Sequence, residues 1–156
     1  MNIIGKPTIH PALFFSGKIL GYSTWIICLI SVIRSYLYNT PMNVVSITSM
    51  GIFIMGLLLS GISMINLGSA TRLGLPNEET TFKSGGLYKI SRNPMYLGFN
   101  LITIGSLIYV HNIFVIVMGC YSIFIYHLII MNEEKFLIKV FGDKYNAYKK
   151  NVRRYL

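Results

Sequence analysis

The chain has 156 residues, of which 53% are hydrophobic and only 12% are charged, and its mean hydropathy is +0.57. These values lie well outside the usual composition of soluble domains and predict an all-α integral membrane protein. The net charge is +9, but the basic residues stand beside apolar runs, so we expect them to meet anionic lipid and expect no nucleic acid partner.

The first apolar region, residues 12–33, predicts a membrane-spanning helix. Lys18 interrupts it near one end, where we expect its stem to run outward to the headgroups. A cleaved signal peptide is the alternative. It is disfavoured because the preceding basic residues are sparse, the apolar run is too long and no small-residue cleavage pattern follows.

The second region, residues 44–67, is free of charge and its 24 residues exceed the roughly 20 that one crossing requires. Small side chains recur along it, and they let helices approach closely where lipid supplies no hydrophobic drive for association. These residues are Gly51, Gly56, Ser60, Gly61 and Ser63.

Residues 93–132 include no Lys, Arg, Asp or Glu, and this 40-residue stretch is twice as long as one crossing requires. At its midpoint His111 and Asn112 predict a tight turn between two spans, residues 95–110 and 113–131. The chain is therefore expected to form one domain over residues 1–156 with four spans.

With four spans, both termini and the loop between spans two and three share one membrane face. Twelve of the 14 Lys and Arg residues fall on that face, which predicts that it is cytoplasmic and that any polar site lies there. They are Lys6, Arg72, Lys83, Lys89, Arg92, Lys135, Lys139, Lys144, Lys149, Lys150, Arg153 and Arg154.

Two polar clusters adjoin the last two predicted spans. Arg92-Asn93-Pro94 reads plainly as a helix start with Asn as N-cap, and the same free N–H groups and guanidinium suit a carboxylate or phosphate. Glu133 and Glu134 are either a solvated pair or a ligand site. At a helix end they oppose the macrodipole, which a bound cation or an amine- and hydroxyl-bearing ligand would offset.

The chain after Gly142 predicts a C-terminal amphipathic helix at the membrane interface. One face carries Tyr145, Tyr148, Val152 and Tyr155, and the basic residues occupy the others. We expect this basic tail to bind anionic lipids.

The sequence lacks the residue patterns of several common catalytic and binding sites. No Gly-x-Gly occurs, so the dinucleotide and phosphate-loop motifs are absent, and neither a Ser-His-Asp nor a nucleophilic Cys arrangement is apparent. The His and Cys residues form no metal-ligand spacing, so we expect no metal. No acid lies inside a predicted span, which argues against an ion-coupled transporter.

Taken together, the two clusters resemble a known family. Gly86-x-Tyr88-x₃-Arg92-Asn93-Pro94-x-Tyr96-x-Gly98, followed by Glu133-Glu134-x₂-Leu137-x₃-Phe141-Gly142-x₂-Tyr145-x₂-Tyr148, is similar to the isoprenylcysteine carboxyl methyltransferases and the related phospholipid N-methyltransferases. The similarity covers residues 71–152. The family usually has His where this chain has Asn93, and an amide cannot take an acid–base role.

The resemblance implies that S-adenosylmethionine is the cofactor and that the methyl acceptor is lipophilic. It implies Arg92 and Glu134 as candidate catalytic residues. The cofactor pocket would be lined by Tyr88, Arg92, Asn93, Pro94, Tyr96, Gly98, Glu133 and Glu134. S-adenosylmethionine carries a carboxylate, an amine and ribose hydroxyls, which require an anion site and an acid site.

Three other functions remain open from the sequence. One is an N- or S-methyltransferase for phospholipids or small molecules, because the motifs concern the cofactor more than the acceptor. Another is a non-catalytic membrane protein with a lipid-binding basic tail. A related fold also serves sterol reductases, but this chain is short for them.

Overall fold

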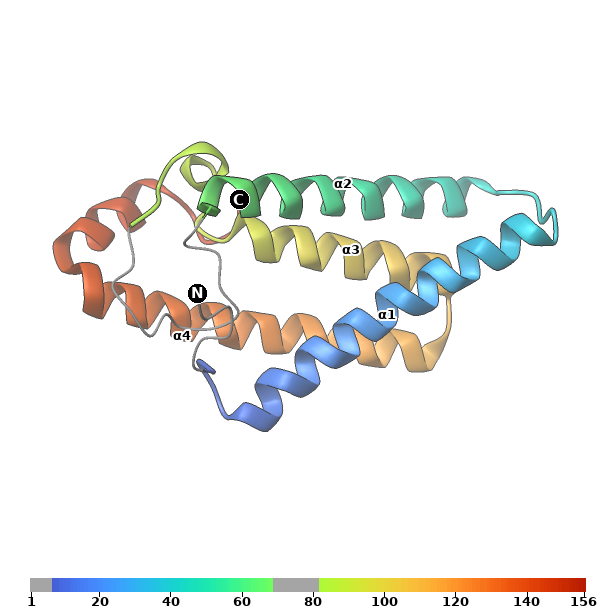
Figure 1. The fold of residues 1–156 in the computed structure, drawn as a ribbon, viewed down its shortest axis with the longest axis horizontal. Helices are drawn as coiled ribbons and strands as arrows, with labels where there is room; N and C mark the ends of the chain where they lie inside the picture. The colour runs from blue at the N-terminus through green and yellow to red at the C-terminus, as the bar shows by residue number, and fades with distance from the viewer. Residues whose placement is uncertain (1–6, 69–81) are drawn as a thin grey trace.

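The computed structural model describes residues 7–68 and 82–156, and those residues form a bundle of α-helices (Figure 1). The helices are α1 (Pro11–Leu37), α2 (Val44–Leu67), α3 (Pro94–Val110) and α4 (Ile113–Asn151), and a short 3₁₀ turn, η2 (Gly86–Lys89), precedes α3. Among them α1, α2 and α4 are long and apolar enough to cross a membrane. The prediction of an all-α membrane protein is confirmed.

The number of spans stays a prediction because α3 is short. Its 17 residues rise about 25 Å at 1.5 Å per residue, a little less than a hydrocarbon core of about 30 Å. By the same measure the 39 residues of α4 are far longer than one crossing requires. The charged half of α4, beyond Met131, therefore extends past the apolar part of the bundle.

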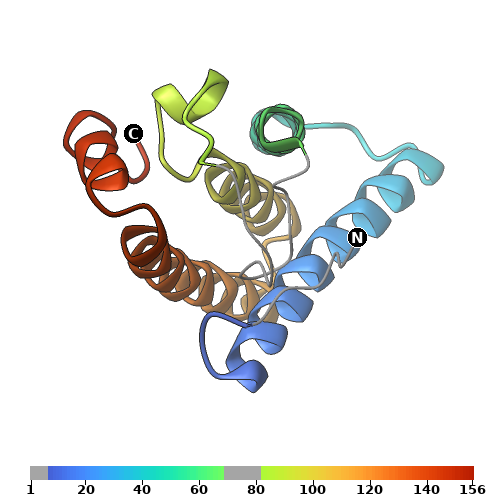
Figure 2. The ribbon, with the colours of Figure 1, turned by 60° about the vertical axis from the view of Figure 1, so that its left-hand side comes forward.

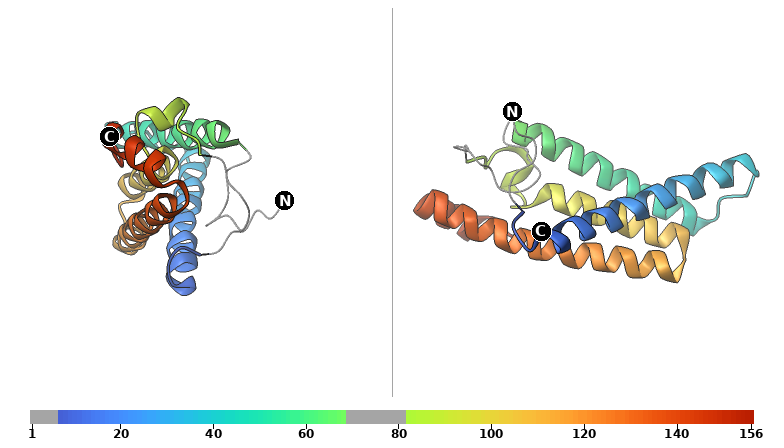
Figure 3. Two further views of the ribbon diagram at one scale, coloured as in Figure 1. Left: turned by 90° about the vertical axis from the view of Figure 1, so that its left-hand side faces the viewer. Right: turned by 60° about the horizontal axis from the view of Figure 1, so that its bottom comes forward.

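Helices α2 and α3 form a closely packed pair, and α1 crosses α4 and α3. Figure 1 shows α2 and α3 side by side along their length, with α4 on the other side of α3. Helix α1 crosses obliquely and packs on both α4 and α3 (Figure 3). Viewed from the end, the last part of α4 bends away from the helix axis toward the η2 side of the bundle (Figure 2).

Helix boundaries follow local chemistry. The Asn43 side chain accepts a hydrogen bond from Ser46 N at 2.8 Å and starts α2. At the predicted hairpin turn, His111 adopts a left-handed conformation with φ 49°, and the Asn112 side chain caps α4 by accepting from Phe114 N at 2.9 Å. The turn at residues 111 and 112 is confirmed.

Helix α4 continues well past the span predicted for residues 113–131. It runs to Asn151 and bends at Gly142, whose φ of 51° favours glycine. Glu133 and Glu134 consequently lie inside a helix, so the expected conflict with the macrodipole at a helix end is wrong, because that effect is confined to the terminal turns. Residues 152–156 are not helical.

The expected C-terminal amphipathic helix is correspondingly shorter. Tyr145 and Tyr148 lie on its helical part, whereas Val152 and Tyr155 follow it. Tyr145 is buried and stacks edge-on against Phe82, so this tyrosine face packs on the protein itself. Its expected role at the membrane interface stays a prediction.

Small residues bring α2 and α3 together, as their pattern predicted. A Cβ atom placed on Gly56 would lie 2.6 Å from the backbone N of Ile102, and one on Gly98 would lie 2.7 Å from the backbone N of Ser60. By contrast, a Cβ atom on Gly61 would meet nothing within 4 Å. Only part of the small-residue set therefore serves this interface.

Lys18 does not reach outward as expected. Its residue is only 8% exposed, and its ammonium lies 4.4 Å from the ring centroid of Phe14 on the same helix. The first span therefore buries this cation beside Phe14, which itself packs with residues of α3 and α4.

The contrast between Gly56 and Gly61 predicts opposite effects of one substitution. Gly56→Ala forces α2 and α3 apart and should cost about 1–3 kcal/mol of stability, as overpacking does. Gly61→Ala should stabilise by up to about 1 kcal/mol because alanine has the higher helix propensity. Thermal unfolding in one detergent compares the two variants, and equal unfolding temperatures would contradict the tight α2–α3 contact.

Candidate functional site

Four segments meet at the end of the bundle where α3 begins. They are η2, the start of α3, the charged half of α4 and the C-terminal residues 152–156, which we call the C-terminal strap (Figure 1). Ser91 of the segment before α3 forms an isolated parallel bridge with Arg153 of the strap. Side chains from all four segments converge on this junction.

Arg92 and Glu134 are directly paired at the junction. Arg92 Nε and Nη2 donate to Glu134 Oε1 at 3.1 Å each, and Nη2 also donates to Oε2 at 3.3 Å. The two side chains are 7% and 5% exposed, so this ion pair is buried. The helical hairpin therefore brings the two sequence clusters together, as their order in the chain led us to expect.

Arg154 of the strap completes the pairing of Glu134. Its Nη2 donates to Glu134 Oε2 at 2.9 Å and its Nε donates to both carboxylate oxygens at 3.2 Å. The hydrogen bond with Glu134 raises the pKa of the Arg154 guanidinium, which stays charged. A buried carboxylate thus lies between two guanidinium groups, which offsets the cost of removing its charge from water.

Hydrogen bonds from the main chain and the guanidinium of Arg92 to main-chain oxygens fix the strap to the start of α3. Arg92 N donates to Arg153 O at 2.9 Å, and Arg92 Nη1 donates to Val152 O at 2.6 Å and to Lys149 O at 3.3 Å. Farther along, the Tyr155 hydroxyl and His127 Nδ1 lie 2.7 Å apart. The strap is therefore held at both ends.

Asn93 occupies the N-cap position of α3 but does not cap it with its side chain. The amide Nδ2 donates instead to Glu134 Oε1 at 3.2 Å and to Arg154 O at 3.3 Å. In this chain the residue that departs from the family pattern therefore contributes to the ion cluster. Pro94 follows as the first helical residue and is fully buried.

Glu133 has a different environment from its neighbour. Its Oε1 accepts a hydrogen bond from the Tyr96 hydroxyl at 2.8 Å, and within the described residues no other hydrogen bond engages this carboxylate. Tyr96 is 6% exposed and belongs to the apolar cluster that joins α1, α3 and α4. Glu133 therefore retains acceptor capacity for a ligand, whereas Glu134 is fully engaged.

Aromatic side chains line the other side of the junction. Phe82 contacts the rings of Phe141, Tyr145 and Tyr148, and the Tyr148 hydroxyl donates to the main-chain oxygen of Tyr88. Burial, with added contributions from Tyr148 and Glu133, raises the pKa of the Tyr88 phenol, which stays uncharged. The polar junction is thus bordered by aromatic surface.

The sequence-predicted residues separate into two groups. Arg92, Asn93, Tyr96, Glu133 and Glu134 lie at the junction, with Tyr88 and Pro94 buried beside them. Gly98 does not join them, because it faces Gly56 and Ser60 of α2.

Arg154 was missed as a site residue. The sequence shows it only as one of several basic residues in the tail, and no spacing marks it out. The family similarity begins at residue 71, and residues 71–81 lie outside the described residues.

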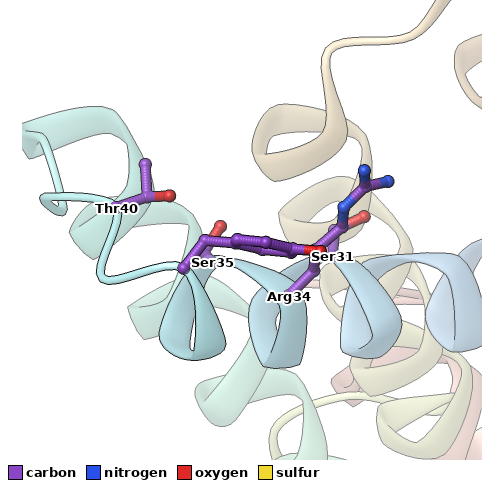
Figure 4. Close-up of a pocket in the computed structure, with 5 residues that line it drawn as sticks. Ser31, Arg34, Ser35 and Thr40 are labelled. Atoms are coloured by element: carbon purple, nitrogen blue, oxygen red, sulfur yellow. The ribbon is translucent and has the colours of Figure 1, made fainter.

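Two other features bear on the chemistry. Within residues 7–68 and 82–156, no three His, Cys, Asp or Glu side chains are placed to hold a metal ion. A shallow hollow elsewhere, around the C-terminal end of α1, is lined by Arg34 and hydroxyl side chains (Figure 4). It shares no residue with the junction.

The fold and the junction define a small helical membrane protein whose buried charges gather at one end. A family model described as phospholipid methyltransferase matches residues 44–144, and the chain belongs to that family. This confirms the resemblance seen in the sequence. The matched residues include the Arg92 cluster and the Glu133–Glu134 pair.

Two curated relatives are methyltransferases. A methanethiol S-methyltransferase of Pseudomonas deceptionensis is 37% identical over 79 residues, which are 46% of this chain and 27% of that protein. A protein-S-isoprenylcysteine O-methyltransferase of Schizosaccharomyces pombe is 25% identical over 124 residues, 76% of this chain and 52% of that protein. The matches thus span about half of one relative and about a quarter of the other. No solved structure matches the chain significantly.

The two adjacent acids should respond differently to neutralisation. Glu134→Gln leaves two guanidinium groups without their counter-charge and should cost about 3 kcal/mol, as breaking a buried pair does. Glu133→Gln keeps an amide oxygen that accepts from the Tyr96 hydroxyl, exchanges a charge-assisted hydrogen bond for a neutral one and should cost about 1 kcal/mol. Hydrogen exchange of the Arg92 amide, which bonds the strap, should accelerate only in Glu134→Gln. Equal exchange in both variants would show that Glu134 does not hold the strap.

Proposed function

We propose that the chain is a membrane-embedded methyltransferase that uses S-adenosylmethionine and modifies a lipophilic acceptor, in the manner of isoprenylcysteine carboxyl methyltransferases. The observation that carries this proposal is the meeting of the Arg92 cluster with the Glu133–Glu134 pair at one end of the bundle. Membership of a methyltransferase family and two methyltransferase relatives support it.

The chemistry of the donor set fits this cofactor. Glu133 has carboxylate capacity for an amine or for ribose hydroxyls, and the Tyr96 hydroxyl holds it in place. When bound, S-adenosylmethionine supplies an electrophilic methyl group on a sulfonium. The remaining residues orient and shield, because an in-line displacement gains mainly from positioning and electrostatics and requires no enzyme nucleophile.

Arg92 and Glu134 remain our candidate catalytic residues. The hydrogen bonds that Arg92 already makes limit how it can bind a ligand. All three guanidinium nitrogens already donate hydrogen bonds, and the weakest by length include the 3.3 Å bonds to Lys149 O and Glu134 Oε2. To orient a ligand carboxylate, Arg92 must exchange one of these bonds. Glu134 then acts by keeping the guanidinium at the start of α3.

We also propose the membrane orientation from the charge distribution. The junction, the start of α1 and the C-terminal strap would face the cytoplasm, where basic residues accumulate. Lys149, Lys150 and Arg153 are exposed there and are available to anionic headgroups, whereas Arg154 is engaged by Glu134.

Direct binding of S-adenosylhomocysteine tests the cofactor. We expect saturable binding in nanodiscs by isothermal titration calorimetry. Glu133→Gln should weaken it by about ten- to a hundredfold, the worth of a hydrogen bond to a charged group. Lys135→Gln, an exposed neighbour, serves as the control and should bind like the wild type. A wild-type protein without saturable binding would remove the cofactor from the proposal.

The second candidate acceptor class is a small thiol, which the 37% identical relative favours. Transfer of a tritiated methyl group from the cofactor, measured in parallel with a prenylated cysteine, an alkanethiol and phosphatidylethanolamine, separates the acceptor classes. We expect label in the prenylated cysteine. Label in the alkanethiol alone would establish the second candidate.

A further inference from the structure

Lys18 is a buried cation that the proposed donor site does not use. It lies in α1, is 8% exposed and places its ammonium over the Phe14 ring at 4.4 Å. Among the described residues no carboxylate lies within ion-pair distance of it. A cation–π contact recovers less free energy than the removal of an ion from water costs. Within residues 7–68 and 82–156 the charge of Lys18 therefore has too little compensation for its burial.

The surroundings of Lys18 join the donor site to apolar surface. Glu133 is the acid with which Lys18 interacts electrostatically, although the two are not in contact. Phe14, on which Lys18 rests, packs in one cluster with Tyr96 of the junction and with Ile129 and Ile130 of α4. A molecule with a polar head at Glu133 and an apolar body in the bilayer would thus pass Lys18.

The charge of the methyl acceptor determines whether a nearby cation helps the reaction. An acceptor anion forms its new bond to the methyl carbon with its own electron pair, while the carbon–sulfur bond breaks and leaves its pair on sulfur. No proton moves in this step. An ammonium acceptor would first have to lose a proton, and a nearby buried cation would disfavour its approach.

We propose that Lys18 binds the anionic nucleophile of the lipophilic acceptor, a carboxylate or a thiolate, and selects it over amine acceptors. This inference rests on the proposed methyltransferase function. Glu133 faces the amine or hydroxyl groups of the donor, and Lys18 supplies the positive charge for the acceptor. The site would then offer a carboxylate to the donor and an ammonium to the acceptor.

A charged probe and an uncharged probe that differ by one methyl group test the proposal. The probes are N-acetyl-S-farnesylcysteine and its methyl ester, and binding is measured by thermophoresis in nanodiscs saturated with S-adenosylhomocysteine. The wild type should bind the acid about tenfold more tightly than the ester, as expected for one charge-assisted contact. Lys18→Met should bind both alike, and Lys18→Arg should restore part of the preference. Lys139→Met, an exposed lysine of α4, is the matched control and should behave as the wild type.

Kinetics add a second readout and separate the two anion sources. Lys18→Met should raise KM about tenfold for whichever of the prenyl-cysteine acid and 1-dodecanethiol is the better acceptor, with S-adenosylhomocysteine affinity unchanged. Equal binding of acid and ester by the wild type would overturn the role of Lys18. So would a Lys18→Met protein that loses S-adenosylhomocysteine affinity but keeps its acid preference, because Lys18 would then serve Glu133 alone. Failure of the wild type to bind S-adenosylhomocysteine would refute the proposed function instead.

Discussion

The buried carboxylate of Glu134, held between Arg92 and Arg154, determines how this end of the bundle is organised. Each of the three groups comes from a different segment: the turn before α3, the middle of α4 and the C-terminal strap. The buried charges of Glu134 and Arg92 would not be stable there alone, because removing an ion from water costs several kcal/mol, and the partly exposed Arg154 adds a second positive charge beside Glu134. The cluster therefore forms as a unit, and it fixes the ends of α3 and α4 and the path of the chain after the kink at Gly142.

This constraint gives two adjacent acids different tasks. Successive helical residues point about 100° apart, so Glu134 faces the two guanidinium groups while Glu133 faces Tyr96 and the helices α1 and α3. Glu134 is committed to the framework and Glu133 retains acceptor capacity. On this side of α4, Glu133 also interacts electrostatically with Lys18. The proposed donor-binding carboxylate and the proposed acceptor-binding ammonium therefore influence each other.

Most of the fold was predictable because its signals are local. Apolar runs located every helix start to within one residue, and His111-Asn112 located the turn between α3 and α4. Helix ends were less certain: α1 includes Arg34 and α4 extends to Asn151. The apolar span ends at Met131, but residues 133–141 are good helix formers and the helix continues through them, as their composition predicts, until Gly142 with its positive φ bends it.

The sequence by itself determined the class of protein and the residue types at its site, because spans, caps and motifs depend on neighbours in the chain. The tertiary structure decided which side chains contact one another. It selected Arg154 from a row of equivalent basic residues, turned Gly98 toward α2 and buried Lys18 instead of extending it to the membrane surface. Such choices depend on which helix faces which, and therefore on packing and on the shared cost of burying charge, which no local pattern records.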